Sequence, residues 1–314
     1  ACDYARIFLY FMPAIMPLFA VDNYLRICGK ANFSMWMNIS VAVLNIILDW
    51  FFLAYLRLDI RFAALATSVS MTLGVLIALT PIFLRKLTLR FTRPRISLST
   101  TLGIFHNGSS EFFNNISGSF MSTVVNAFLL HLGGGTAVAA YGIVMYLDSL
   151  LLMALYGILD SLQPPVSYNI GAGNHQKARE FFRLSCKFTA AISLAFLRAM
   201  VCFPRELASL FLQENSAEVL EMTVTALRLY APAYLFLWLN MVISSFLTAM
   251  DRAKDSLTIM LFRALIFPSL SLAIFPQILD VTGIFITPAI SGALTVIIST
   301  TIWHRLGKQQ PQEA

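Results

Sequence analysis

Charged residues are scarce in this chain. Only 12% of its 314 residues are Asp, Glu, Lys or Arg, whereas 58% are hydrophobic and the mean hydropathy is +0.75. A soluble domain has about a quarter charged residues, so the composition excludes that class. Long apolar stretches with few charges predict membrane-spanning helices of about 20 residues. The sequence therefore predicts an all-α polytopic membrane protein.

Signatures of enzymes and metal sites are also missing. The sequence has no HExxH, GxSxG or P-loop pattern, and its four cysteines form no CxxC pair. We therefore expect a protein that is not an enzyme and that has no cofactor. The net charge of +6 does not indicate nucleic acid as a partner, because the basic residues lie in short loops between apolar stretches.

Apolar stretches indicate about nine transmembrane helices. The fourth stretch is longer than one crossing needs, so its start is expected to follow the membrane interface or to bend near Gly103 or Gly108. Pro232, Pro268 and Pro276 can break or kink helices. The predicted spans are 4–20, 34–56, 62–84, 100–131, 136–161, 184–204, 222–249, 257–278 and 283–303.

Lys and Arg in the connections predict the orientation. Fifteen of them lie on one side and four on the other, which places the richer side in the cytoplasm together with the C-terminus. Segment 85–95 is basic and is expected to contact anionic membrane lipids. The fifteen are Arg26, Lys30, Arg85, Lys86, Arg90, Arg93, Arg95, Lys177, Arg179, Arg183, Lys187, Arg252, Lys254, Arg305 and Lys308.

Two segments of the chain look like copies of one another. Residues 58–84 and 279–305 share seven identities in 27 aligned positions, where this composition gives roughly two or three by chance. Six predicted spans separate the ends of the copies, so the repeat is parallel, as in many secondary transporters. A second match, at an offset of 222 residues, pairs Leu25, Lys30, Ala31 and Ser34 with Leu247, Arg252, Ala253 and Ser256.

The repeat predicts how the chain is organised. Residues 1–84 form a partial N-lobe of three helices, 85–99 a cytoplasmic linker, 100–304 a complete six-helix C-lobe and 305–314 a cytoplasmic tail. The first copy lacks roughly 120 residues, so the first three helices of its lobe are expected upstream. The chain opens on Ala1 with neither an initiator Met nor a signal peptide, which fits that expectation.

Glu111 is the foremost candidate for chemistry, because an ionisable group inside a membrane is costly and marks a functional site. Helical spacing places Asn107, Asn114 and Asn115 on the same face as Glu111. A carboxylate among amide oxygens can bind and release H⁺ or hold Na⁺. We predict a coupling-ion site at these four residues, the alternative being an acid that joins helices and never titrates.

Asp148 in the fifth span is a possible pathway residue, with Tyr141 seven residues before it on roughly the same face. An equally good interpretation makes Asp148 the ion-pair partner of Arg198, Arg228 or Arg263.

Asn45 and Asp49, four residues apart near the outer end of the second span, are further pathway candidates. For this pair, capping or hydrogen bonding between helices is the favoured interpretation.

Four stretches resemble the multidrug and toxic compound extrusion (MATE) family. The resemblance implies a prokaryotic inner-membrane antiporter with two six-helix lobes that exchanges organic cations or drugs for H⁺ or Na⁺. On that reading the chain holds helices four to six of one lobe and the whole of the other. The stretches are 23–30 (NYLRICGK), 43–49 (VLNIILD), 134–142 (GGTAVAAYG) and 163–174 (QPPVSYNIGAGN).

The resemblance also bears on the site. Family members often couple ions through an acid in the seventh helix, and Glu111 occupies a similar position. Some relatives have a second acid in the tenth helix, whereas span 222–249 offers only Tyr230 and Asn240 there. The expected partners are small cationic or amphipathic substrates and lipids, with the protein a monomer. A lipid-linked oligosaccharide flippase and an inactive membrane fragment are the alternatives.

Overall fold

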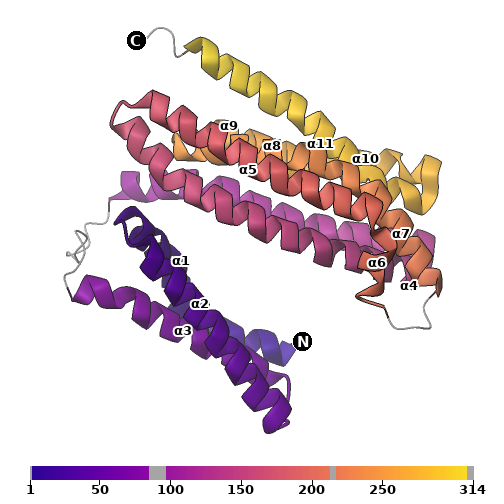
Figure 1. Cartoon of the computed structure of the whole chain (residues 1–314), viewed down its shortest axis with the longest axis horizontal. Helices are drawn as coiled ribbons and strands as arrows, with labels where there is room; N and C mark the ends of the chain where they lie inside the picture. Colours follow the sequence, from indigo (N-terminus) through magenta and orange to yellow (C-terminus); the bar gives the residue numbers. More distant parts are fainter. Residues whose placement is uncertain (1, 85–96, 213–216, 310–314) are drawn as a thin grey trace. The chain divides into compact units, whose positions relative to one another are not determined.

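A computed structural model describes residues 2–84, 97–212 and 217–309 of the chain. All regular secondary structure in these ranges is helical, which confirms the all-α class. The chain divides into two units, residues 1–95 and 96–314, which Figure 1 shows with their helices labelled. Residues 85–96 of the predicted linker 85–99 and residues 310–314 of the predicted tail 305–314 lie outside the described residues, so the domain boundaries stay predictions.

Unit 1 consists of three long helices. They are α1 (Cys2–Ile27), α2 (Ala31–Asp49), which continues as a π-helix (Trp50–Tyr55), and α3 (Arg61–Phe83). Small residues let these helices approach closely. A Cβ added at Gly74 of α3 would lie only 2.6 Å from Cγ2 of Val41 on α2. The buried core comprises Leu18, Val21, Leu25, Met37, Val75, Ala78 and Ile82.

Unit 2 is larger, and its long helices run side by side in Figure 1. The longest, α4, packs against α5, α7, α8 and α9. The elements in order are α4 (Leu98–Gly171), α5 (His175–Cys202), α6 (Pro204–Ser209), α7 (Ala217–Tyr230), a 3₁₀ turn (Ala231–Ala233), α8 (Tyr234–Ala249), α9 (Ala253–Leu261), a π-helix (Phe262–Ile266), α10 (Phe267–Ile274) and α11 (Pro276–Gln309).

Helix α4 is interrupted at Gly134, whose φ of 62° and ψ of −159° are not helical. Met121 and Val125 before the break line the same cavity as Tyr141 and Asp148 after it. The two halves of α4 therefore lie side by side as a helical hairpin. A positive φ suits glycine, which has no Cβ to clash, and the break falls in the predicted gap between residues 131 and 136.

The start of the fourth span, predicted to follow the interface or to bend near Gly103 or Gly108, stays a prediction. Both glycines lie within the helix that begins at Leu98, and Gly134 is the interior residue of α4 with non-helical angles.

Eight helices in the described ranges are long and apolar enough to cross a membrane. One of them, Asn115–Gly171, contains the Gly134 break, so the predicted count of nine and the six-helix repeat stay predictions. Many large apolar side chains of both units are exposed, as expected of helices that face lipid. The chain is a multi-pass membrane protein.

Candidate functional site

A cavity of about 490 Å³ lies within unit 2. Its walls come from both halves of α4, the 3₁₀ turn, α8, the π-helix, and the starts of α10 and α11 beyond Asp280. Apolar residues alternate there with hydroxyl and amide groups, which is the usual makeup of a site for a small organic molecule.

One buried carboxylate faces this cavity. Asp148 is 8% exposed, and the hydroxyl of Tyr234 donates a hydrogen bond of 3.0 Å to its Oδ1. Tyr141, two helical turns before Asp148 on the same face of α4, lines the same cavity. A buried charge is costly unless it is hydrogen-bonded or paired, and the Tyr234 hydroxyl is one such partner of Asp148.

The chain positions the tyrosines through a local break in the helix. Pro232 lies in the 3₁₀ turn Ala231–Ala233, between the end of α7 and the start of α8. Proline has no backbone N–H, so it interrupts the α-helical hydrogen bonds there. The rings of Tyr230 and Tyr234 pack edge to face with centroids 5.7 Å apart.

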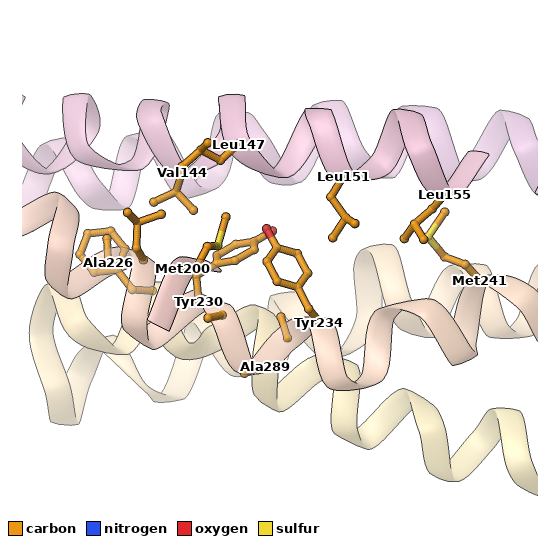
Figure 2. Close-up of a cluster of buried hydrophobic side chains, with 14 of the residues drawn as sticks. Val144, Leu147, Leu151, Leu155, Met200, Ala226, Tyr230, Tyr234, Met241 and Ala289 are labelled. Atoms are coloured by element: carbon orange, nitrogen blue, oxygen red, sulfur yellow. The ribbon is translucent and has the colours of Figure 1, made fainter. Parts of the chain in front are cut away.

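Apolar packing holds Asp148 in place. Figure 2 shows Val144, Leu147, Leu151 and Leu155 of α4 opposite the two tyrosines. These four side chains are buried in the main core cluster of unit 2. Residues at i, i+3, i+4 and i+7 lie on one helix face, so the face that carries Asp148 turns toward α7 and α8.

A cation also lines the cavity. Arg263 lies in the π-helix Phe262–Ile266, directly before α10. Pro268 at the start of α10 cannot donate to the carbonyl of Ala264, which favours the wider π turn at this point. The Nη2 of Arg263 lies 3.5 Å from Sδ of Met260. Among the lining residues of the described chain, Asp148 and Arg263 are the two that carry charge.

Five predicted site residues come together at the cavity. Tyr141, Asp148, Tyr230 and Asn240 line it, as does Asn115 from the first half of α4. Of the other five, Asn107, Glu111 and Asn114 have side chains outside the described part of the structure. The roles assigned to all of these residues stay predictions.

Asn240 has a clear structural task. It is fully buried, and its Nδ2 donates to the carbonyl of Gly292 at 3.1 Å. Its Oδ1 accepts from the hydroxyl of Ser299 at 2.7 Å. Asn240 thereby joins α8 to α11 in the wall of the cavity.

Asn45 and Asp49 lie in unit 1 and take no part in this cavity. The Nδ2 of Asn45 donates to Oγ1 of Thr67 at 3.3 Å, a bond from α2 to α3. Asp49 is the last residue of α2, directly before the π-helix.

Tyr234 and Arg263 were not singled out as cavity residues from the sequence. A signal for Tyr234 existed, since it follows Tyr230 by four residues and so falls on the same helix face. The sequence indicated Arg263 only as one of three alternative ion-pair partners of Asp148. The other two, Arg198 and Arg228, are exposed on α5 and α7.

Metal ligands do not cluster in the described residues. No group of three or more His, Cys, Asp or Glu side chains converges there. Glu111 falls outside that search, so the predicted Na⁺ site at this residue stays a prediction.

Known proteins share this sequence pattern. A family model described as MatE matches residues 112–273, more than half of the chain. The FAD transporter of Shewanella oneidensis is 28% identical over 97% of this chain and 68% of its own length. The multidrug export protein MepA of Staphylococcus aureus is 24% identical over 74% of this chain and 53% of its own. The chain thus spans only part of these curated relatives.

Solved structures share the fold. An outward-facing multidrug resistance MATE family transporter of the MOP superfamily matches with a TM-score of 0.89 at 23% identity, over 99% of this chain and 70% of its own. A MATE structure in complex with MaL6 matches with 0.91 at 22%, over the same shares. Together with the family match, these findings confirm the resemblance seen in the sequence motifs: the chain belongs to the MATE family of transporters.

Proposed function

We propose that the whole protein is a secondary active antiporter that exports organic cations or drugs in exchange for H⁺ or Na⁺. Alternating access between two lobes would expose the site to each side of the membrane in turn. The observation that carries this proposal is the buried carboxylate of Asp148 at the wall of the cavity. The name of MepA, a multidrug export protein, supports the same substrate class.

A single carboxylate can link the two fluxes. H⁺, Na⁺ and an organic cation each neutralise Asp148, so binding of one displaces another. Competition at one site makes the two binding equilibria reciprocal, as linkage requires. The tyrosine rings around the carboxylate offer their electron-rich faces to an organic cation.

Glu111 remains the proposed coupling-ion site, together with Asn107, Asn114 and Asn115. The backbone is helical over all four residues, and Asn115 lines the cavity. An ion held by Glu111 would then lie on the same half of α4 that forms one cavity wall.

Accumulation of a fluorescent organic cation in everted membrane vesicles, whose outer face is the cytoplasmic one, tests the proposal. The whole protein should export the dye when a proton or Na⁺ gradient is imposed. Asp148→Asn keeps the shape of the side chain and removes its charge, so it should reduce coupled efflux to background. Glu111→Gln tests the predicted coupling site in the same way.

Asp255→Asn provides a matched control, because Asp255 is a half-exposed acid on α9 that does not line the cavity. It should export at the wild-type rate. Wild-type efflux from Asp148→Asn, at equal expression, would contradict the role given to this carboxylate.

Export of an organic anion is a second candidate, favoured by Arg263 in the cavity wall. The relative from Shewanella oneidensis is named an FAD transporter and is similar over nearly the whole chain. A guanidinium binds phosphate oxygens in a bidentate manner. Everted vesicles supplied with FAD in the outer solution distinguish the two candidates. Arg263→Gln should abolish FAD uptake if the anion is the substrate and should spare dye transport otherwise.

A flippase for lipid-linked oligosaccharides is less well supported. The pyrophosphate of such a lipid would need several basic side chains in the cavity. Among the described residues, Arg263 is the single basic residue that lines it. An inactive membrane fragment would show neither dye nor FAD transport in vesicles.

We also propose that the protein lies in the inner membrane with its C-terminus in the cytoplasm, as the distribution of Lys and Arg indicates. Lys308→Cys, in a background without the native cysteines, tests this. A membrane-impermeant thiol reagent should label it in everted vesicles and leave it unlabelled in intact cells. Labelling in intact cells would reverse the orientation.

A further inference from the structure

Three helix-to-helix turns of this chain have the same backbone geometry. They join α1 to α2, α4 to α5, and α8 to α9. Each contains one residue with positive φ: Gly29 at 73°, Gly173 at 74° and Asp251 at 59°. All three turns carry basic residues of the side predicted to be cytoplasmic.

The hydrogen bonds of the turns correspond one by one. In the first turn the amide of Lys30 donates to the carbonyl of Leu25 at 2.8 Å. The same bond joins Asn174 to Asn169 at 2.7 Å and Arg252 to Leu247 at 2.9 Å. This long bond around a residue with positive φ is the Schellman pattern that ends many helices. The further matching donors are Cys28, Ala172 and Met250; Gly29, Gly173 and Asp251; and Ser34, Ala178 and Ser256.

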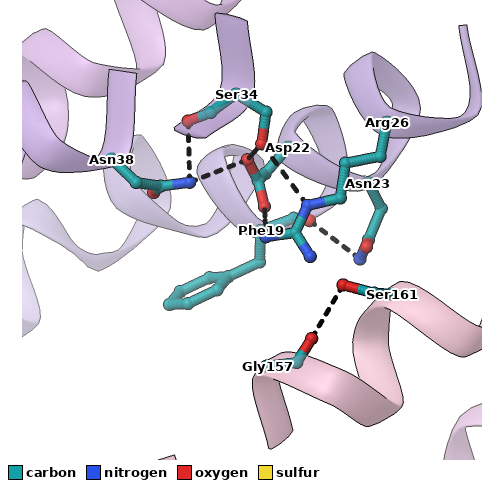
Figure 3. A network of polar contacts seen from close by, with 8 residues as sticks. All are labelled: Phe19, Asp22, Asn23, Arg26, Ser34, Asn38, Gly157 and Ser161. Carbon is teal, nitrogen blue, oxygen red and sulfur yellow. Dashed lines mark hydrogen bonds and ion pairs between the residues drawn. The ribbon is translucent and has the colours of Figure 1, made fainter. Parts of the chain in front are cut away.

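In the first turn, side chains at positions 22, 26 and 34 stabilise the contact between the two helices, and two of them are charged. Asp22 forms an ion pair of 2.8 Å with Arg26 and accepts a hydrogen bond from the hydroxyl of Ser34 on α2. The Nδ2 of Asn38 adds a bond of 2.9 Å to the same carboxylate. Figure 3 shows this cluster, which we call the ionic clamp (Asp22, Arg26, Ser34, Asn38).

The third turn uses hydroxyl groups at the same positions. Ser256 lies 2.9 Å from the hydroxyl of Ser244 and 2.8 Å from that of Thr248. Ser244 and Ser256 are fully buried. The groups at these positions are neutral, and the ion pair of this turn, Arg252 with Asp255 at 3.6 Å, involves other positions and stays on the α9 side.

The second turn uses apolar groups there. Val166 and Ala178 are fully buried, and Ile170 packs against the same core. The backbone turn therefore requires neither charge nor hydroxyl groups at these positions. The charge of the first turn needs another explanation.

Exposure distinguishes the ionic clamp from the other two fastenings. The side chains of Arg26 and Asp22 are 27% and 14% exposed. Partly exposed ion pairs are weakened by dissolved salt, whereas buried hydroxyl and apolar contacts are affected much less. The first turn is thus the one whose helix-to-helix contacts at these positions depend on charge and respond most to salt.

We propose that the ionic clamp is a latch that opens during the transport cycle and lets α1 and α2 change their angle. The α4–α5 and α8–α9 turns stay closed and keep their helix pairs rigid. Asp22 and Arg26 are positioning residues in this scheme and contact no substrate. Only the link to transport rests on the proposed function, since the opening of the clamp can be measured by itself.

Amide hydrogen exchange of the purified whole protein tests the latch. Raising the salt concentration from about 0.1 M to about 1 M shortens the screening length from about 10 Å to about 3 Å. Peptides covering Cys28–Lys30 should then exchange several-fold faster. Peptides covering Ala172–Asn174 serve as the internal control and should not change. Equal responses of the two turns would overturn the proposal.

Variants that give the first turn the side chains of the other two turns provide a second test. Asp22→Val with Arg26→Ile and Ser34→Ala copies the α4–α5 turn, and Asp22→Ser with Arg26→Thr copies the α8–α9 turn. Each variant should lose the salt response at Cys28–Lys30. A salt response that persists in both would overturn the proposal, and the second variant keeps the test decisive if the first does not fold.

Dye efflux then tests the link to transport. The transplanted variants should export several-fold more slowly than the wild type while unfolding at the same temperature or higher. Wild-type efflux from a variant without a salt response would show that transport does not need the latch to open. Absence of efflux from the wild type itself would refute the proposed function and leave the exchange result unaffected.

Discussion

Tyr234 lies fully buried beside the cavity and depends on Asp148 as the partner of its hydroxyl. A buried polar group without a partner costs about 1–3 kcal/mol. The pair therefore restrains the carboxylate in one orientation, which a site for a small cation needs. The same bond makes Asp148 sensitive to changes on α8.

Tyr234→Phe should lower the free energy of unfolding by about 1 kcal/mol, because it removes the hydroxyl donor and keeps the ring. Thermal unfolding in detergent, followed by tryptophan fluorescence, measures this loss. Tyr10→Phe is the control, since Tyr10 is 82% exposed and should tolerate the change. An equal midpoint for both variants would contradict the structural role of the hydroxyl.

Asn240→Ala should destabilise the protein more than Ser299→Ala. The first change breaks both bonds, removes a larger buried side chain and leaves the Ser299 hydroxyl without this acceptor, which costs about 1–3 kcal/mol, while the Gly292 carbonyl keeps its place in helix α11. The second leaves only the amide oxygen of Asn240. The same unfolding assay ranks the two variants, and the reverse order would refute the account of this wall.

Part of the site could be predicted from the sequence at the residue scale. Asp148 was identified because an ionisable group stands out in an apolar span, and Tyr141 because it lies seven residues before Asp148 on the same face. Asn240 was identified through the resemblance to the MATE family. Tyr234 was missed because the expected break at Pro232 hides its relation to Tyr230. The short 3₁₀ turn keeps the two rings together in spite of that break.

The start of α11 contains a sharp backbone turn that depends on two residues, Asp280 and Gly283. Asp280 has a φ of 49° and a ψ of −135°, so the chain turns sharply there. A Cβ added at Gly283 would lie 2.4 Å from the carbonyl oxygen of Phe275 and 2.8 Å from N of Pro276. Only glycine allows the returning helix to pass this close to the backbone.

Gly283→Ala should destabilise the protein by several kcal/mol, comparable to strong overpacking. Gly157→Ala is the matched control, because nothing lies within 4 Å of its added Cβ. Alanine is the better helix former by about 1 kcal/mol, so the control should be neutral or stabilising. Thermal unfolding midpoints of the two variants measure the difference. Similar midpoints for Gly283→Ala and Gly157→Ala would contradict the close approach at Gly283.

The helical elements themselves followed from hydrophobic length. The gap at 131–136 predicted the break at Gly134, because glycines there interrupt two long apolar runs. The π-helix at Phe262–Ile266 was not predicted. It depends on how the missing N–H of Pro268 is accommodated, which neighbouring helices decide.

At the scale of the whole molecule, composition and motifs sufficed for the class and the family. They did not suffice for the site, because the cavity joins residues from α4 and α11 that are more than 100 positions apart. Contacts between such distant segments leave no local periodicity in a sequence. The chain also spans 68% of the FAD transporter and 53% of MepA, so activity must be measured on the whole protein.

Competition between ions and substrate for Asp148 is the central claim, and equilibrium binding of a fluorescent organic cation to the purified whole protein tests it most directly. Wild-type affinity should weaken as the concentration of H⁺ or Na⁺ rises. In Asp148→Asn the affinity should be weaker and independent of both ions. Undiminished competition by H⁺ or Na⁺ in Asp148→Asn would contradict the account.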